Sequence, residues 1–248
     1  MNTCTRHLIT LLCTLTPLTA MAAPRNLVEA DRENDASVDR GLLSSHAETL
    51  RAGEITFNSY QLFLAGLSAG VTDDLQLSGT FLLPAFEVFP FFGIFQGKYS
   101  LSRSETTSIS VTANAIYTEG GFTSFGPGLS IDHHLGAVSL HGTLIVNAAL
   151  GEDEFDDDRE VESGFLVVAD LGFTARLSKR FKLLGELKVP MLLAAGENSG
   201  FSEDLALATY GVRFHGSNLA ADLAFLRPVT DYEDFVLGVP YVAFSARF

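Results

Sequence analysis

The stretch TSISVTANAIYT, which runs from Thr107 to Thr118, decides the fold. From Ile109 to Tyr117 every second residue is apolar, and the residues between are polar except Ile116. Successive side chains of a β-strand point to opposite faces, so this alternation predicts a strand with one apolar and one mixed face. The run is long enough to cross a bilayer, which takes about 9–11 residues, whereas a common soluble strand has about 5–6.

The same alternation recurs along the chain after residue 54, in segments such as 75–83, 138–149 and 164–177. The connections between these segments alternate in length. The tight turns lie at 72–74, 103–105, 135–137, 178–180 and 215–217, and the longer loops at 84–90, 119–124, 150–163, 195–204 and 227–237. Short turns at one rim and long loops at the other are typical of a transmembrane β-barrel.

The last nine residues, Pro240 to Phe248, carry the sharpest single signal. Their alternate positions form an apolar face made of Val242, Phe244, Ala246 and Phe248. This face resembles the C-terminal recognition strand of Gram-negative outer-membrane barrel proteins. The resemblance covers residues 54–248 and selects no single named family. It implies an all-β, antiparallel, up-and-down transmembrane barrel in the outer membrane. The implied partners are outer-membrane lipids, lipopolysaccharide and the barrel-assembly machinery, which reads the assembly signal.

The N-terminus has the features of a secretory signal peptide over residues 1–22. A short apolar region follows Arg6, and Ala20-Met21-Ala22 predicts cleavage near Ala22. Residues 23–53 are richer in charge and predict a polar N-terminal arm on the periplasmic side. Two interpretations stay open for it: an arm with a helical turn around Leu42 and Leu43, or a disordered leader.

Composition excludes several classes of protein. The formal net charge is −14, which argues against a nucleic-acid partner because such proteins need a basic face. Apolar residues make up 47% and charged residues 19%, so the chain has ample surface to bury. Beyond the N-terminus no apolar run reaches the length of a helical span. A soluble β-sandwich remains the competing fold, but its strands would usually be shorter.

The segment count predicts the number of strands. Eleven alternating segments are visible, whereas bacterial single-chain barrels have even numbers of strands. Segment 54–71 is unusually long, and its apolar phase shifts partway from odd to even positions. A register shift turns every later side chain to the other face, so a bulge or a hidden hairpin is expected there. We predict twelve strands, with ten as the alternative.

Charged residues on the inward face predict a network in the lumen. The turn at 178–180 sets Asp170 opposite Lys188, which attract, and Arg176 opposite Lys182, which repel unless an acid intervenes. Two functions fit such residues, a selectivity strip in a channel or a salt-bridge network that stiffens the wall. The lumen-facing candidates are Asp132, His134, His141, Asp170, Arg176, Lys182, Glu186, Lys188, Arg213 and Asp222.

Two weaker patterns concern chemistry. Asp132, His134 and His141 could ligate a metal or transfer protons, but their spacing matches no metal motif, so we expect neither metal nor cofactor. The sequence His215-Gly216-Ser217-Asn218 resembles the H-x-S-N motif of lipid A deacylase barrels. Its predicted place on the periplasmic rim and its ordinary turn residues favour a turn instead. We therefore expect a protein that is not an enzyme.

The expected function is a small channel or passive transporter for small or apolar solutes. The alternatives are a lipid-modifying enzyme of the outer membrane and a structural barrel without transport. Inward-phase leucines such as Leu184 predict a partly apolar, poorly conducting lumen. Either an apolar solute passes along that wall, or Leu42, Leu43 and the stretch Phe86–Phe92 pack against it from inside.

Overall fold

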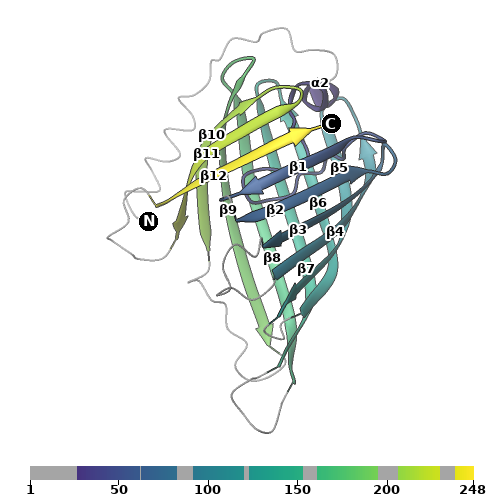
Figure 1. The fold of residues 1–248 in the computed structure, drawn as a ribbon, viewed down its shortest axis with the longest axis vertical. Coiled ribbons are helices and arrows are strands. Elements are labelled where there is room, and N and C mark those ends of the chain that lie inside the picture. The colour runs from purple at the N-terminus through teal and green to yellow at the C-terminus, as the bar shows by residue number, and fades with distance from the viewer. Residues whose placement is uncertain are drawn as a thin grey trace.

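A computed structural model describes residues 27–61, 63–82, 92–119, 123–152, 161–194, 206–229 and 238–248. In this part of the chain twelve antiparallel strands close into a barrel (Figure 1). Each strand pairs with its neighbours in sequence, and β1 pairs with β12 to close the seam. The predicted up-and-down barrel of twelve strands is confirmed, and the ten-stranded alternative is excluded. The strands are β1 (Ile55–Tyr60), β2 (Leu64–Gly70), β3 (Leu75–Leu82), β4 (Phe92–Arg103), β5 (Thr107–Thr118), β6 (Thr123–Leu135), β7 (Val138–Glu152), β8 (Val161–Arg176), β9 (Phe181–Ala194), β10 (Leu207–His215), β11 (Leu219–Pro228) and β12 (Val239–Arg247).

The long first segment is a hairpin of β1 and β2. Tyr60 pairs with Leu64 at its closed end. Gln61 at the turn has a φ of 52°, in the left-handed region that most residues avoid. Its amide N–H donates to the Val242 carbonyl at 2.8 Å, which holds the turn against β12. The tight turn explains why the apolar phase shifts within residues 54–71.

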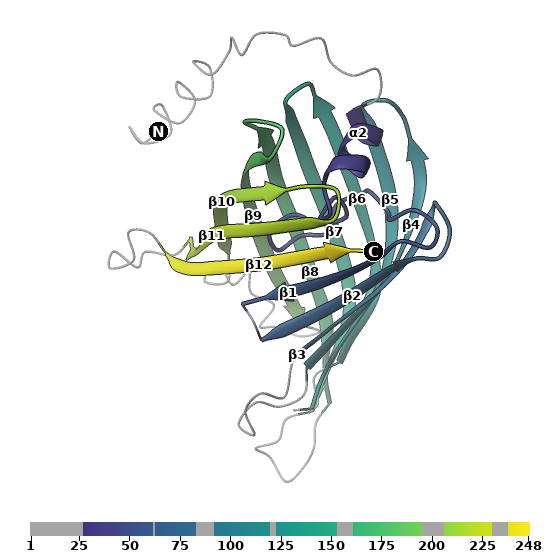
Figure 2. The same cartoon turned by 45° about the horizontal axis from the view of Figure 1, so that its top comes forward.

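The barrel wall is taller on one side. Strands β1 and β2 have 6 and 7 residues, whereas β7, β8 and β9 have 15, 16 and 14. The tight turns, the C-terminus and helix α2 (Leu27–Asn34) lie at one rim, and the longest strands extend at the opposite end (Figures 1 and 2). The loops expected there fall largely outside the described residues. Of the stretch Phe86–Phe92, the structure describes Phe92 alone, the first residue of β4.

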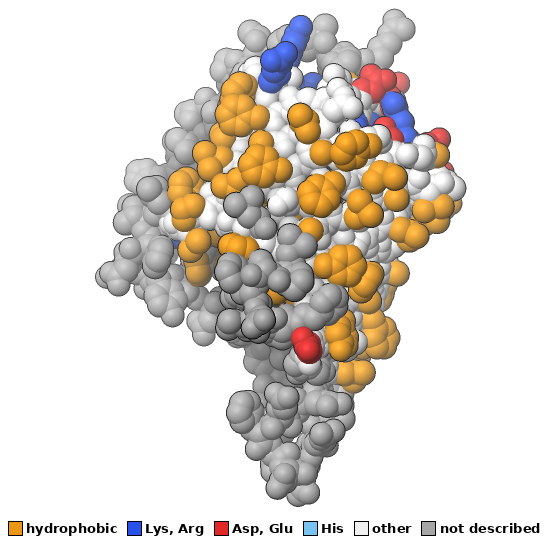
Figure 3. Space-filling model, in the orientation of Figure 1, with side chains coloured by type: hydrophobic (Ala, Val, Ile, Leu, Met, Phe, Trp, Pro, Cys, Tyr) orange, Lys and Arg blue, Asp and Glu red, His pale blue; other side chains and the backbone are white. Residues whose placement is uncertain are grey.

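The outer surface of the barrel is apolar, as a lipid-facing wall requires. Exposed aromatic and aliphatic side chains spread over the strands in Figure 3, whereas most charged side chains on this face gather at the upper rim. The apolar face of β12 is part of this surface, because Phe244 and Phe248 are exposed and Val242 and Ala246 share their side of the strand. Among the described helices, none has the length and hydropathy of a membrane span.

Closure of the sheet predicts a heat-dependent mobility on gels. A closed barrel has no free edge strand, so detergent alone should unfold it slowly. Unboiled protein is expected to stay compact in SDS and to migrate differently from boiled protein. Identical mobility before and after boiling would contradict the closed sheet.

Candidate functional site

Residues 27–50, called the plug here, occupy the inside of the barrel. Helix α2 lies at the rim of the tight turns, and the following residues run through the lumen (Figure 2). Ala36, Leu42 and Leu50 have no exposed surface at all. The interpretation as a disordered leader is therefore wrong. The helical turn expected around Leu42 and Leu43 is also wrong, because the helix lies earlier in the chain and residues 42–44 form a bend.

The bend forms because a wall carboxylate binds its backbone amides. Glu186 on β9 accepts the N–H of Leu42 at 2.5 Å and the N–H of Leu43 at 2.9 Å. In a helical turn, later amides would instead donate to carbonyls four residues earlier. Charge-assisted hydrogen bonds of this kind are stronger than neutral ones, so they determine the local backbone here. The same principle recurs at Asp132, which accepts the N–H of Ala47 at 2.9 Å.

Arg213 on β10 binds the centre of the plug. All five of its N–H donors have acceptors, and its exposed fraction is 1%. Two donors bind the carboxylate of Asp222 on β11, at 2.6 and 3.0 Å. The other three bind main-chain carbonyls of the plug, those of Ser37, Arg40 and Gly41, at 2.8–3.2 Å. A single buried guanidinium thereby joins the wall to three plug residues.

Arg40 forms the reciprocal contact from the plug to the wall. Its guanidinium donates to Asp222 at 2.8 Å and to the Ser245 hydroxyl on β12 at 2.7 Å. It also lies over the ring of Tyr60, 5.2 Å from the ring centre. Asp222 thus lies between two arginines, one from the wall and one from the plug. This arrangement neutralises a carboxylate that could not otherwise remain ionised when buried.

A second group of charges lies nearer the tight-turn rim. Arg176 and Lys182 are opposite each other in the β8–β9 register, as the sequence predicted. The acid that their repulsion requires comes from the plug: Asp31 contacts Arg176 and lies 3.5 Å from Lys182. Lys182 also donates to Asp35 at 2.7 Å. Burial alone would raise the pKa of Asp35, but Lys182 and Arg213 outweigh it and hold that pKa well below its usual range.

The helical end of the plug is fixed by hydrogen bonds from the same rim. Arg247 on β12 donates to the carbonyls of Arg32 and Glu33, in the last turn of α2, at 2.5 and 3.1 Å. The imidazole of His215 contacts the Asn34 carbonyl at 2.9 Å. Carbonyls at a helix C-terminus have no partner within the helix, and cationic side chains are favourable there. These contacts therefore cap α2 against the barrel.

The H-x-S-N turn belongs to this cap. Ser217 donates to the neighbouring Asn218 side chain at 2.8 Å, whereas His215 binds the helix carbonyl. The side chains of His215 and Ser217 therefore bond to different partners. The geometry describes a turn that holds the plug, and it gives the catalytic interpretation no support.

The two histidines that face each other come from different parts of the chain. His46 of the plug stacks on His141 of β7, with ring centres 3.8 Å apart and an interplanar angle of 9°. Both ring nitrogens of His141 are also engaged, since Nδ1 contacts Asp132 at 3.1 Å and Nε2 contacts Thr174 at 2.9 Å. His134 lies apart, with Ser139 at 2.7 Å. The expected trio is thus split, and His46 takes the place of His134.

The stack does not have the geometry of a metal centre. Ligand atoms of His46, Asp132 and His141 all lie within 4.8 Å of one another. An imidazole nitrogen, however, binds a metal in the plane of its own ring, and two parallel stacked rings do not direct their lone pairs to one point. One ring would have to rotate and break its present contacts. We therefore interpret the group as a contact between plug and wall.

Protonation of His46 is disfavoured in this stack. Burial is the largest cause, followed by the facing charges of His141, Arg213, Lys98 and Lys182, and together they hold the pKa of His46 well below its usual value. A released histidine has a pKa of about 6.5. Below that pH the released plug binds more protons than the seated plug. The seated state is therefore fully stabilised above about pH 6.5 and loses stability as the pH falls below it.

Lowering the pH from 7.5 to 5.5 should therefore loosen the plug. Burial raises the pKa of the plug residue Glu48, so its protonation at low pH favours the seated plug and opposes the loosening. The loss is at most about 1.4 kcal/mol per pH unit for one group. The measurement is the rate of protease cleavage within residues 27–50 at the two pH values. The control is His46→Gln, which removes His46 and leaves the other plug-contacting histidines, His134 and His215, in place. Equal pH dependence in both proteins would show that His46 is not the responsible group.

The remaining candidates, Asp170 and Lys188, also face the lumen. Lys188 donates to Asp170 at 3.0 Å, which confirms the predicted β8–β9 pairing. Leu184 is buried and packs with Leu42, Ala224 and Tyr241. Polar side chains nevertheless outnumber apolar ones among the buried residues. The lumen is more polar than expected, because most plug contacts are hydrogen bonds and ion pairs.

The comparisons with known proteins concern the fold. No family model matches the chain, and no curated protein matches it. Among solved structures, the NanC porin matches with a TM-score of 0.51 at 7% identity, covering 78% of this chain and 97% of that chain. The Acinetobacter baumannii outer membrane protein Omp33 matches with a TM-score of 0.40 at 8% identity, covering 79% and 95%. Together with the closed twelve-stranded sheet, the first likeness defines the fold class: the chain is a twelve-stranded β-barrel with a porin-like fold.

Proposed function

We propose that the protein is an outer-membrane channel for small polar solutes, closed in the described state by its plug. The observation that carries this proposal is the way in which the lumen is filled. A structural barrel of modest size can be filled by side chains of its own wall. Here a separate segment fills it, and within the described residues that segment contributes no strand to the sheet. It can leave without breaking the pairing of any two strands.

The polarity of the wall favours polar rather than apolar solutes. When the plug leaves, it uncovers groups such as Arg213, Asp222, Lys182 and Glu186. Such groups are readily hydrated, whereas wetting an apolar wall costs about 25 cal/mol per Å². The proposed orientation puts the tight turns and the plug entrance in the periplasm and the long loops outside. Lipopolysaccharide and the assembly machinery are proposed partners of the outer face and of β12.

Solute flux into proteoliposomes tests the proposal. Full-length protein should admit small polar solutes slowly, and a variant that lacks residues 27–50 should admit them rapidly up to a size limit. The variant must first show the heat-dependent mobility of a closed barrel. A structural barrel without transport predicts no flux from either protein, even when the shortened barrel is folded.

A further inference from the structure

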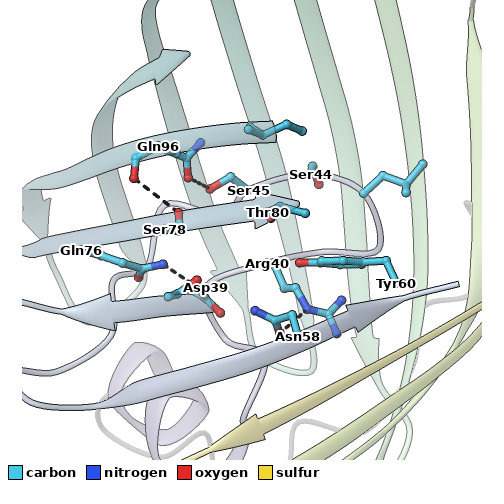
Figure 4. Close-up of a pocket in the computed structure, with 13 residues that line it drawn as sticks. Asp39, Arg40, Ser44, Ser45, Asn58, Tyr60, Gln76, Ser78, Thr80 and Gln96 are labelled. Carbon is cyan, nitrogen blue, oxygen red and sulfur yellow. Dashed lines mark hydrogen bonds between the residues drawn. The ribbon is translucent and has the colours of Figure 1, made fainter. Parts of the chain in front are cut away.

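A polar cavity of about 140 Å³ lies between the plug and the wall strands β1 to β4. Plug residues Asp39 and Ser45 line one side, and wall residues Ser78, Thr80 and Gln96 line the other (Figure 4). At about 30 Å³ per water molecule, this space equals about five waters. The cavity is therefore large enough for a small organic solute.

Charges of both signs surround the cavity. Arg40 uses its donors on Asp222, Ser245 and other acceptors of the wall and plug. The Lys98 ammonium donates to the main-chain oxygen of Asp39 at 3.0 Å, and Lys98 and Asp39 attract each other electrostatically. An added anion would meet the Asp39 carboxylate, and an added cation would meet the positive charges of Arg40 and Lys98. An uncharged ligand fits this balance better.

One buried acceptor in the lining is unsatisfied. Asp39 is 5% exposed, and its Oδ2 accepts from Gln76 at 2.8 Å. Its Oδ1 is buried and has no hydrogen-bond partner among the described residues. A buried polar atom without a partner calls for a donor such as a bound water or a ligand group. A hydroxyl of a solute would supply that donor without bringing a charge.

The rest of the lining suits the same chemistry. The side chains of Ser78, Thr80 and Gln96 can each donate and accept a hydrogen bond. Leu43 and Ile94 add an apolar border on which C–H groups can pack. We propose that this cavity binds a small neutral polyol through its hydroxyl groups. That the polyol is also transported rests on the proposed channel function. Its binding in the cavity does not depend on that function.

Ligand-observed NMR and calorimetry on the full-length protein test the site. The probes are glycerol and erythritol, with the carboxylate glycerate and the amine 3-amino-1,2-propanediol as charged analogues. The double variant Ser78→Ala/Thr80→Val removes two hydroxyls without adding volume. Its control is Ser110→Val, an inward serine of β5 that does not line the cavity. Both variants must show the heat-dependent mobility of the parent.

We expect saturable binding of the neutral polyols, weaker binding of both charged analogues, and affinity lowered about tenfold or more in the double variant. Ser110→Val should bind as the parent does. No saturable binding, or equal affinity in the double variant, would overturn the site, and stronger binding of a charged analogue would overturn its neutral ligand class. Flux through the variant lacking residues 27–50 separates the two proposals. Polyol binding without flux would contradict the channel proposal and support the binding site. Flux without polyol binding would support the channel and contradict the binding site.

Discussion

Replacing Arg213 with methionine should release the plug. The substitution removes five hydrogen bonds. Two of them go to the wall residue Asp222, and three go to main-chain carbonyls of the plug. It also removes the cation 3.7 Å from Asp35. Asp222 and Asp35 keep Arg40 and Lys182 as cationic partners. Each hydrogen bond from a charged donor contributes about 1.5–3 kcal/mol, and the plug loses three of them. The ratio of open to closed channels should therefore rise by about a hundredfold or more.

Single-channel recording in planar bilayers measures this ratio, and Arg176→Met is the matched control. Arg176 also contacts a plug carboxylate, that of Asp31, but its side chain is 31% exposed at the rim. Exposed ion pairs contribute about 1 kcal/mol or less. The control should therefore open the channel only slightly. If the two substitutions open it equally, or if neither does, Arg213 does not hold the plug in place.

Deleting Phe248 should remove most of the protein from the outer membrane. The Phe248 N–H donates to the Ile55 carbonyl at 2.8 Å, and the Ile55 N–H donates back at 3.2 Å. These bonds continue the β1–β12 seam that closes the barrel. Together they contribute about 1–3 kcal/mol. The deletion also removes the terminal aromatic residue of the proposed assembly signal, whose side chain is 77% exposed.

The measurement is the yield of heat-modifiable protein in the outer-membrane fraction. Leu219→Ala is the control, because Leu219 is 68% exposed on neighbouring β11 and its substitution leaves the strand backbone intact. It should assemble almost as well as the parent. Normal assembly without Phe248, or an equal loss in the control, would contradict the special role of the terminal residue.

The barrel could be predicted because its determinants are local and periodic. Alternation with a period of two assigns each residue to a face, and a tight turn then fixes the register of both strands. This is why the pairs Asp170–Lys188 and Arg176–Lys182 lie where the sequence placed them. The phase shift in residues 54–71 likewise predicted a bulge or a hairpin, and the structure shows a hairpin.

The plug could not be predicted in the same way, because its structure depends on distant residues. Arg213 binds Gly41 across 172 positions of the chain, and Glu186 binds Leu42 across 144. Residues 27–50 carry no periodic pattern, so their charges resembled those of a solvated arm. One signal did point to the lumen: Arg176 opposite Lys182 required an acid from elsewhere. The plug supplies it as Asp31.

A reversible cross-link tests most directly that the plug closes a channel. The Ala36 N–H donates to the Gly216 carbonyl at 2.9 Å, and a side chain added at Gly216 meets only ordinary contacts. The chain has no cysteine after residue 13, so a cysteine pair at 36 and 216 would be the only one in that part. Introduced into the Arg213→Met variant, the pair can be oxidised and reduced during one bilayer recording. We predict that the oxidised channel stays closed and that reduction opens it to the conductance of Arg213→Met. A conductance that does not change with a disulfide shown to form and break would contradict closure by the plug.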